Sequence, residues 1–105
     1  MAEQVYVYAI IYDVREEEET LKAKREANTR RRNLHEEIGK RWKENSFVML
    51  GDSAYAIRSN NPNADEIHGF LMQYLIEDVD RLTVIPCLEP WESTQINFNK
   101  WLSHL

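Results

Sequence analysis

The chain has 105 residues, 43% hydrophobic and 30% charged, a composition typical of one globular domain. The formal net charge of −5 argues against a general affinity for nucleic acid, because such affinity comes from lysines and arginines that neutralise phosphates. The single cysteine, Cys87, excludes an intramolecular disulfide, and no Cys/His spacing resembles a zinc site. With no long apolar run at the N-terminus, the sequence predicts a cytoplasmic protein that is neither secreted nor inserted in a membrane.

The first expected element is a strand over residues 4–14, a segment dense in valine, isoleucine and tyrosine. Because side chains alternate along a strand, the segment has two apolar faces, which predicts a central strand covered on both sides. For the tyrosines we favour packing in the core or in a dimer interface over stacking on bases. One face contains Val5, Val7, Ala9, Ile11 and Asp13, and the other contains Tyr6, Tyr8, Ile10 and Tyr12.

A charged segment over residues 15–28 follows, with Leu21, Ala23 and Ala27 as its only apolar residues. It is either a loop or a solvated helical extension. We favour the loop, because so few apolar residues cannot bury a continuous face. The run of glutamates at its start indicates a solvated segment, with an acidic mimic of nucleic acid as the alternative.

The first helix is expected to begin at a cap provided by Asn28 or Thr29 and to continue to about residue 44. Its apolar residues recur at four-residue spacing, which is typical of a helix with one buried face. These residues are Leu34, Ile38 and Trp42.

Two short apolar runs around Gly51-Asp52 predict a hairpin with strands near residues 46–50 and 53–59, since glycine accepts a positive φ without steric penalty. A second helix is expected after Asn63, which can act as its N-cap together with Glu66 three residues later. Helical spacing then predicts one apolar face made of Ile67, Phe70, Leu71, Tyr74 and Leu75.

The segment "RLTVIPCL" predicts a last strand at a sheet edge, because Pro86 cannot donate a ladder hydrogen bond. An apolar stripe then predicts a terminal helix over about residues 94–105. The order β, α, β, β, α, β is the ferredoxin-like order, so we expect an α+β fold of that kind with an additional C-terminal helix, in one domain over residues 1–105. This topology places the first strand in the centre of the sheet and the last at an edge.

The same topology places several acids and arginines at the rim where the first strand ends. Carboxylates there are suitable ligands for Mg²⁺ or Mn²⁺, and a bound metal could activate water for phosphodiester cleavage, with Asp13 as the catalytic residue. Arginines near a helix N-terminus match phosphate geometry. The alternative is that the acids form turns and the arginines a solvated face. The candidate metal ligands are Asp13, Asp52 and Asp80, and the candidate nucleic-acid-binding residues are Arg30, Arg31, Arg32 and Arg81.

The remaining titratable residues indicate structural roles. His35, His68 and His104 lack metal-ligand spacing, so we expect surface histidines or histidines with satisfied hydrogen bonds. Cys87 is expected to be a buried strand residue, because no neighbouring motif would lower its pKa.

Three segments give the chain a resemblance to the CRISPR-associated Cas-two family and, more loosely, to VapD-type ribonucleases. They are "YAIIYDV", similar to the family's first strand, "GDSAYAIRS", at its second strand region, and "DRLTVIPCL", similar to its last core strand. The resemblance implies that Asp13 is the metal-binding aspartate near a homodimer axis. It also implies that one of Arg30 to Arg32 matches a basic residue of the first helix. The acidic insertion and the helical terminus depart from the family pattern.

These observations leave three candidate functions. The first is a Cas-two-like homodimeric binding or scaffold protein that engages nucleic acid or a protein partner. The second is a metal-dependent endonuclease that uses Asp13, and the third is an acidic inhibitor that binds a protein. The acidic balance and the lack of a dense set of catalytic residues favour the first. Uncovered apolar surface predicts a homodimer formed through the Tyr6/Tyr8/Tyr12 face or the terminal helix.

Overall fold

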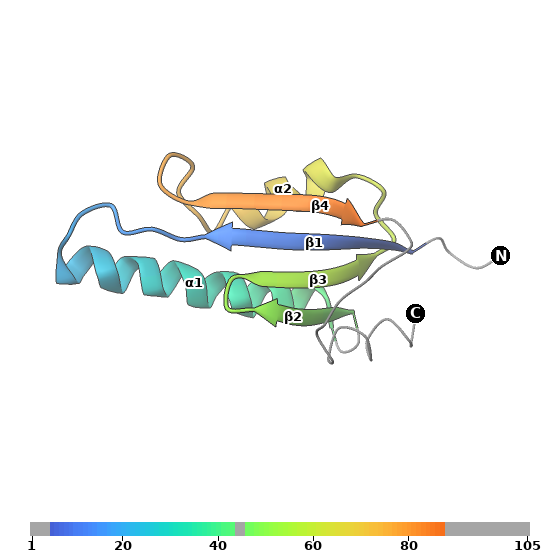
Figure 1. The fold of residues 1–105 in the computed structure, drawn as a ribbon, viewed down its shortest axis with the longest axis horizontal. Coiled ribbons are helices and arrows are strands. Elements are labelled where there is room, and N and C mark those ends of the chain that lie inside the picture. The colour runs from blue at the N-terminus through green and yellow to red at the C-terminus, as the bar shows by residue number, and fades with distance from the viewer. Residues whose placement is uncertain (1–4, 44–45, 88–105) are drawn as a thin grey trace.

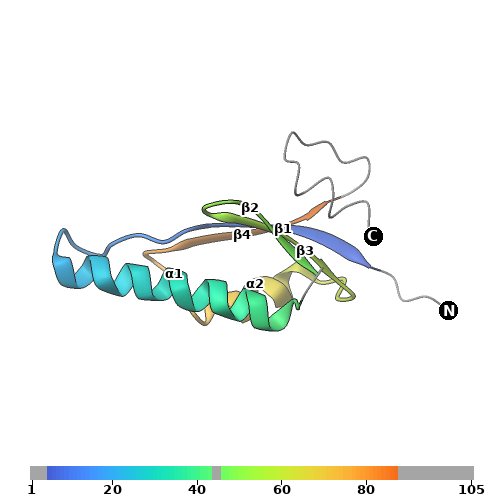
Figure 2. The ribbon, with the colours of Figure 1, turned by 90° about the horizontal axis from the view of Figure 1, so that it is seen from below.

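The computed structural model describes residues 5–43 and 46–87. Its four strands form one antiparallel sheet in the order β2-β3-β1-β4, so β1 is central and β4 is an edge strand, as the sequence predicts. Both helices lie on the same side of this sheet (Figures 1 and 2), which makes the fold α+β. The predicted terminal helix over residues 94–105 lies outside the described residues. The elements are β1 (Tyr6–Asp13), α1 (Leu21–Arg41), β2 (Phe47–Gly51), β3 (Ala54–Ser59), α2 (Ala64–Met72) and β4 (Arg81–Cys87).

The tyrosine face of β1 packs beneath the two helices. Tyr8, Ile10 and Tyr12 are buried in the main hydrophobic core, which confirms the core role expected for these tyrosines. The proposed use of this face for dimerisation is wrong, because helices of the same chain already cover it. The helix residues in this core include Leu34, Ile38, Ile67 and Leu71.

The opposite face of the sheet is covered only in part. Val7 and Ala56 are buried in a second, smaller cluster. In contrast, Val5, Ile11 and Ile85 remain 55%, 46% and 44% exposed. The described helices leave this outer face partly exposed, and its expected cover by a partner subunit or by the terminal helix stays a prediction.

The helix α1 begins directly after Thr20, whose side-chain oxygen accepts a hydrogen bond of 3.1 Å from the backbone N–H of Ala23. Most of the charged segment over residues 15–28 is therefore helical, and the prediction of a loop was wrong. Ala23 and Ala27 are buried on the same face as Leu34 and Ile38. Two small side chains are enough to continue the buried face, and the lysines, arginines and glutamates between them are good helix formers.

The hairpin forms as predicted, with its turn shifted by one residue. Gly51 pairs with Ala54, so Asp52 and Ser53 make the two-residue turn. The ladder is irregular between Met49 and Gly51. Gly51 has no positive φ, so this turn does not need the ability of glycine to adopt one.

The second helix begins after Asn63, also as predicted, but without the expected capping box. The Asn63 side chain accepts no cap hydrogen bond, and Glu66 instead accepts a 2.8 Å hydrogen bond from the side chain of Asn61. Ile67 and Leu71 supply the buried face of α2, and Leu75 is buried just beyond its end. No helix in residues 5–43 or 46–87 has the length and apolar character needed to cross a membrane.

Candidate functional site at the carboxyl end of β1

The rim predicted from the topology is present at the carboxyl end of β1. Asp13 lies opposite Arg81 in the antiparallel pair of β1 and β4. On the other side, the backbone N–H of Tyr12 donates a 3.0 Å hydrogen bond to the carbonyl of Ser53 in the hairpin turn. The start of β4, the hairpin turn and the end of β1 therefore meet, and α1 passes beside them (Figure 1).

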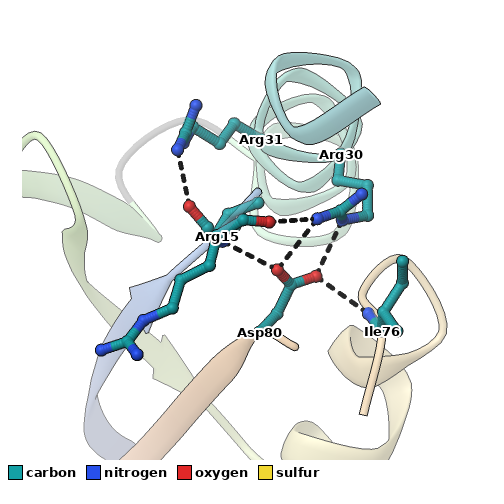
Figure 3. A network of polar contacts seen from close by, with 6 residues as sticks. Arg15, Arg30, Arg31, Ile76 and Asp80 are labelled. Carbon is teal, nitrogen blue, oxygen red and sulfur yellow. Dashed lines mark hydrogen bonds and ion pairs between the residues drawn. The ribbon is translucent and has the colours of Figure 1, made fainter. Parts of the chain in front are cut away.

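Asp80 is at the centre of this rim, and its carboxylate is enclosed by donors (Figure 3). The Arg30 guanidinium donates to both carboxylate oxygens, from Nε at 2.8 Å and from Nη2 at 3.2 Å. Backbone N–H groups of Arg15 and Ile76 donate at 3.0 and 2.9 Å. Asp80 is only 4% exposed. It therefore joins α1, the segment after β1 and the turn before β4.

The electrostatics of Asp80 match this geometry. Burial by itself would raise the pKa of the carboxyl group, but hydrogen bonds from Arg30, Ile76 and Arg15 outweigh it and hold the pKa below its ordinary value. The carboxylate is therefore charged and satisfied at neutral pH. A buried aspartate whose oxygens are occupied by four donors stabilises the fold, and the metal-ligand role of Asp80 remains a prediction.

Arg30 and Arg31 both bind the chain that leaves β1. Arg30 donates from Nη2 to the carbonyl of Arg15 at 2.7 Å, in addition to its contacts with Asp80. Arg31 donates to the carbonyl of Val14 at 2.6 Å and to the side chain of Asn28 at 2.5 Å. Neighbouring arginines of α1 thus fix the β1–α1 connection, so two of the four predicted phosphate contacts serve the fold.

Asp13, the aspartate that ends β1, points to solvent. Its carboxylate accepts a 2.8 Å hydrogen bond from Arg15 Nε, in an ion pair whose side chains are about half exposed. Exposed ion pairs contribute little stability, so the fold does not depend on this pair. The metal-binding and catalytic roles of Asp13 remain predictions.

Asp52 contacts the rim through its backbone. The carbonyl of Asp52 accepts a 3.1 Å hydrogen bond from the hydroxyl of Tyr12. Within residues 5–43 and 46–87, no group of three or more His, Cys, Asp or Glu side chains is placed to hold a metal ion. The predicted three-aspartate site of Asp13, Asp52 and Asp80 is therefore not assembled.

The other two predicted phosphate contacts, Arg32 and Arg81, are exposed. In the part of the chain that the structure describes, neither side chain forms a hydrogen bond or an ion pair. Arg81 stays at the rim, whereas Arg32 lies on the side of α1 that faces away from the sheet. The four predicted arginines thus have three different environments.

An aromatic cluster lies under the hairpin turn. The Tyr12 hydroxyl is hydrogen-bonded to His35 Nε2, and the His35 ring makes edge contacts with both Tyr12 and Tyr55. Burial lowers the pKa of His35, so this ring is neutral at pH 7. Burial also raises the pKa of Tyr12, so its phenol stays protonated.

The other candidate residues also have structural surroundings. His68 is within 3.1 Å of the Leu82 carbonyl, so both described histidines have partners, and His104 lies outside the described residues. Cys87 is half-buried, and burial raises the pKa of its thiol. The raised pKa makes the Cys87 thiol a poorer nucleophile.

Sequence reasoning missed two members of the Asp80 network, the backbone amides of Arg15 and Ile76. One signal was available: an aspartate four residues after Ile76 can close a turn, and here the Asp80 N–H also donates to the Ile76 carbonyl at 2.8 Å. The burial of Asp80 had no local signal, because acidic and basic residues surround it in the sequence.

The comparisons with known families and curated proteins found no match: no protein-family model matches the chain, and no curated protein matches it.

Proposed function

We propose that this protein is a non-catalytic nucleic-acid-binding protein whose contact surface is the outer face of α1. The observation that carries the proposal is a set of cations on this face without partners among the described residues. Eight of the thirteen lysines and arginines are in α1, against three glutamates, although the whole chain has a net charge of −5. The positive charge that phosphate binding requires is therefore concentrated on one helix.

Three side chains define the outer face: Lys22, Arg25 and Arg32. They are exposed, and the spacings of three and seven residues place them on one side of the helix, opposite the buried Ala27 and Leu34. Lys40 extends the same row to the end of α1, where it makes a 3.4 Å ion pair with Glu37. At a rise of 1.5 Å per residue, the row from Lys22 to Lys40 is about 27 Å long.

This surface differs from the one expected from the sequence. Arg30 and Arg31 were expected to bind phosphate, but both side chains are held by the β1–α1 connection and by Asp80. A guanidinium that already has these partners has fewer donors left for a phosphate. The phosphate-binding role that we propose therefore passes to Arg32 and its neighbours on the outer face.

We further infer a ferredoxin-like fold, a homodimer and a relationship to Cas-two proteins. The order β2-β3-β1-β4 supports the fold. The exposed apolar residues of the sheet, which include Ile11 and Ile85, support association with a second copy. The relationship is supported by Asp13, because it is exposed at the end of β1, where the resemblance would put the family's aspartate.

The experiment is a measurement of affinity for a short DNA duplex at several salt concentrations. If three side chains neutralise three phosphates, log K should fall with log salt with a slope of about −3. The double variant Arg25→Gln/Arg32→Gln should reduce the slope to about −1. Arg15→Gln is the matched control, since it removes a charge from the rim. An equal loss in the control, or no dependence on salt, would contradict the proposed surface.

A second candidate is an acidic module that binds a basic protein. The observation in its favour is the exposed run of Glu16, Glu17, Glu18 and Glu19, which lies beyond the end of β1. Such a run could contact the positive surface of a partner. Absence of binding to any duplex or single strand, together with capture of a basic protein that is lost when these glutamates are changed to glutamine, would favour this candidate.

A further inference from the structure

A pocket of about 570 Å³ lies at the end of the sheet opposite Asp80. It is formed by the last residues of α1, the connection from β3 to α2 and the first turns of α2. Its volume is within the range of small-molecule sites, roughly 300 to 1,000 Å³. The lining includes Arg41, Asn60, Asn61, Asn63, Glu66 and Phe70.

One wall of the pocket is a preformed stack. The guanidinium carbon of Arg41 lies 5.1 Å from the centroid of the Phe70 ring. Phe70 is itself held by edge contacts with Trp42 and Tyr74, at centroid distances of 6.4 and 6.0 Å. Arg41 is exposed. A guanidinium plane of this kind is a surface on which an unpaired base can stack.

The other wall presents side-chain amides. Asn61 is fixed in place, because its Nδ2 donates to Glu66 at 2.8 Å and its Oδ1 accepts from the Asn63 backbone at 2.9 Å. The backbone carbonyl of Asn61 also accepts a 2.7 Å hydrogen bond from the Tyr8 hydroxyl. The Asn63 side chain is less engaged: it makes a long 3.4 Å contact to Glu66, and its oxygen accepts no cap hydrogen bond. The Asn63 side-chain oxygen and the second N–H of its Nδ2 are an acceptor and a donor side by side, which match the edge of a base.

We propose that this pocket binds an unpaired nucleobase at the end of a strand whose phosphates contact the outer face of α1. This inference rests on the proposed function. The row of cations ends at Lys40, next to Arg41, so a strand that follows α1 arrives at the pocket. Glu66 decides which part of the nucleotide enters, because its carboxylate repels a phosphate but not a neutral base.

The test compares a blunt DNA duplex with the same duplex carrying a short single-stranded overhang that contains 2-aminopurine. The overhang should increase affinity about tenfold, as expected for one stacked base. The fluorescence of the 2-aminopurine should fall on binding, because stacking quenches it. Thermal melting of each variant checks that it is folded.

Two variants separate the pocket from the helix face. Asn63→Ala should reduce the overhang preference and leave affinity for the blunt duplex unchanged, since Asn63 lies in the pocket and not in the row of cations on α1; the helix should stay folded, because Asn63 forms no cap hydrogen bond. Arg25→Gln/Arg32→Gln should weaken binding of both duplexes and retain the preference. Equal affinity for blunt and overhanging duplexes would overturn the pocket assignment and leave the proposed function intact. Failure of both duplexes to bind would overturn both.

Discussion

Arg30 and Arg32 are two residues apart in one helix and have opposite environments. The Arg30 side chain is 12% exposed and donates to the buried carboxylate of Asp80. Arg32 is exposed and has no partner among the described residues. The helix turns about 100° per residue, so three consecutive arginines point in different directions. The comparison shows that a basic run on a helix divides into residues that hold the fold and residues available to a ligand.

The same contrast separates the two ends of the molecule. At the end of β1, the charged groups of Asp80 and Arg30 are enclosed and satisfied, which leaves little for a ligand to bind. At the end of α1, the pocket contains an exposed guanidinium on Phe70 and the incompletely used amide of Asn63. The site with the most hydrogen bonds therefore leaves the fewest polar groups for a ligand.

The largest expected effect comes from breaking the buried ion pair. Asp80→Ala and Arg30→Ala should each lower the free energy of unfolding by about 3 to 5 kcal/mol, because each leaves an uncompensated charge in a buried place. Arg32→Ala is the matched control and should change it by less than about 0.5 kcal/mol. Urea denaturation measures all three. Similar losses for Arg30→Ala and Arg32→Ala would remove the distinction between the two arginines.

Acid should remove the stabilisation by the Asp80–Arg30 ion pair without any substitution, because it protonates the Asp80 carboxylate. The pKa of Asp80 is lowered in the folded state, so the stability from this group is complete above the unfolded pKa of about 3.9 and is lost as the pH falls through the folded pKa. The difference in unfolding free energy between the wild type and Asp80→Asn should be constant from pH 7 to pH 5 and shrink below about pH 4. A difference that shrank already at pH 6 would assign the linkage to another group.

A smaller pH effect is expected at the other side of the rim. Burial lowers the pKa of His35, so folding favours the neutral ring. Stability from this group is complete above the unfolded pKa of about 6.5 and is lost as the pH falls from there towards the folded pKa. His35→Gln should flatten the decrease in melting temperature between pH 7 and pH 5. Parallel curves for the two proteins would show that His35 does not carry the effect.

The smallest expected effect on stability is at Asp13. Asp13→Asn removes one exposed ion pair with Arg15, so the free energy of unfolding should change by about 1 kcal/mol or less. We expect no Mg²⁺- or Mn²⁺-dependent cleavage by either protein. Asp52→Asn is the control, as another exposed acid of this rim. Cleavage by the wild type that Asp13→Asn abolishes and Asp52→Asn retains would establish the endonuclease and overturn the non-catalytic proposal.

The amino-acid sequence alone determined most of the described secondary structure. The density of β-branched and aromatic residues in β1, the turn residues around Gly51 and the apolar spacing of α2 each act within a few residues, so local patterns predicted them. Pro86 in "RLTVIPCL" was enough to place β4 at an edge. The element order then brought Asp13 beside Arg81, because adjacent antiparallel strands must meet end to start.

Only the tertiary structure decided where α1 begins and what its arginines do. Ala23 and Ala27 are weak hydrophobic signals in a charged segment, and they become a buried face only because that end of α1 packs against the rest of the chain. The same packing fixes the rotation of α1, which turns Arg30 towards Asp80, fifty positions away in the chain, and turns Arg32 outwards. Contacts over such separations depend on the docking of whole elements, and no local pattern encodes them.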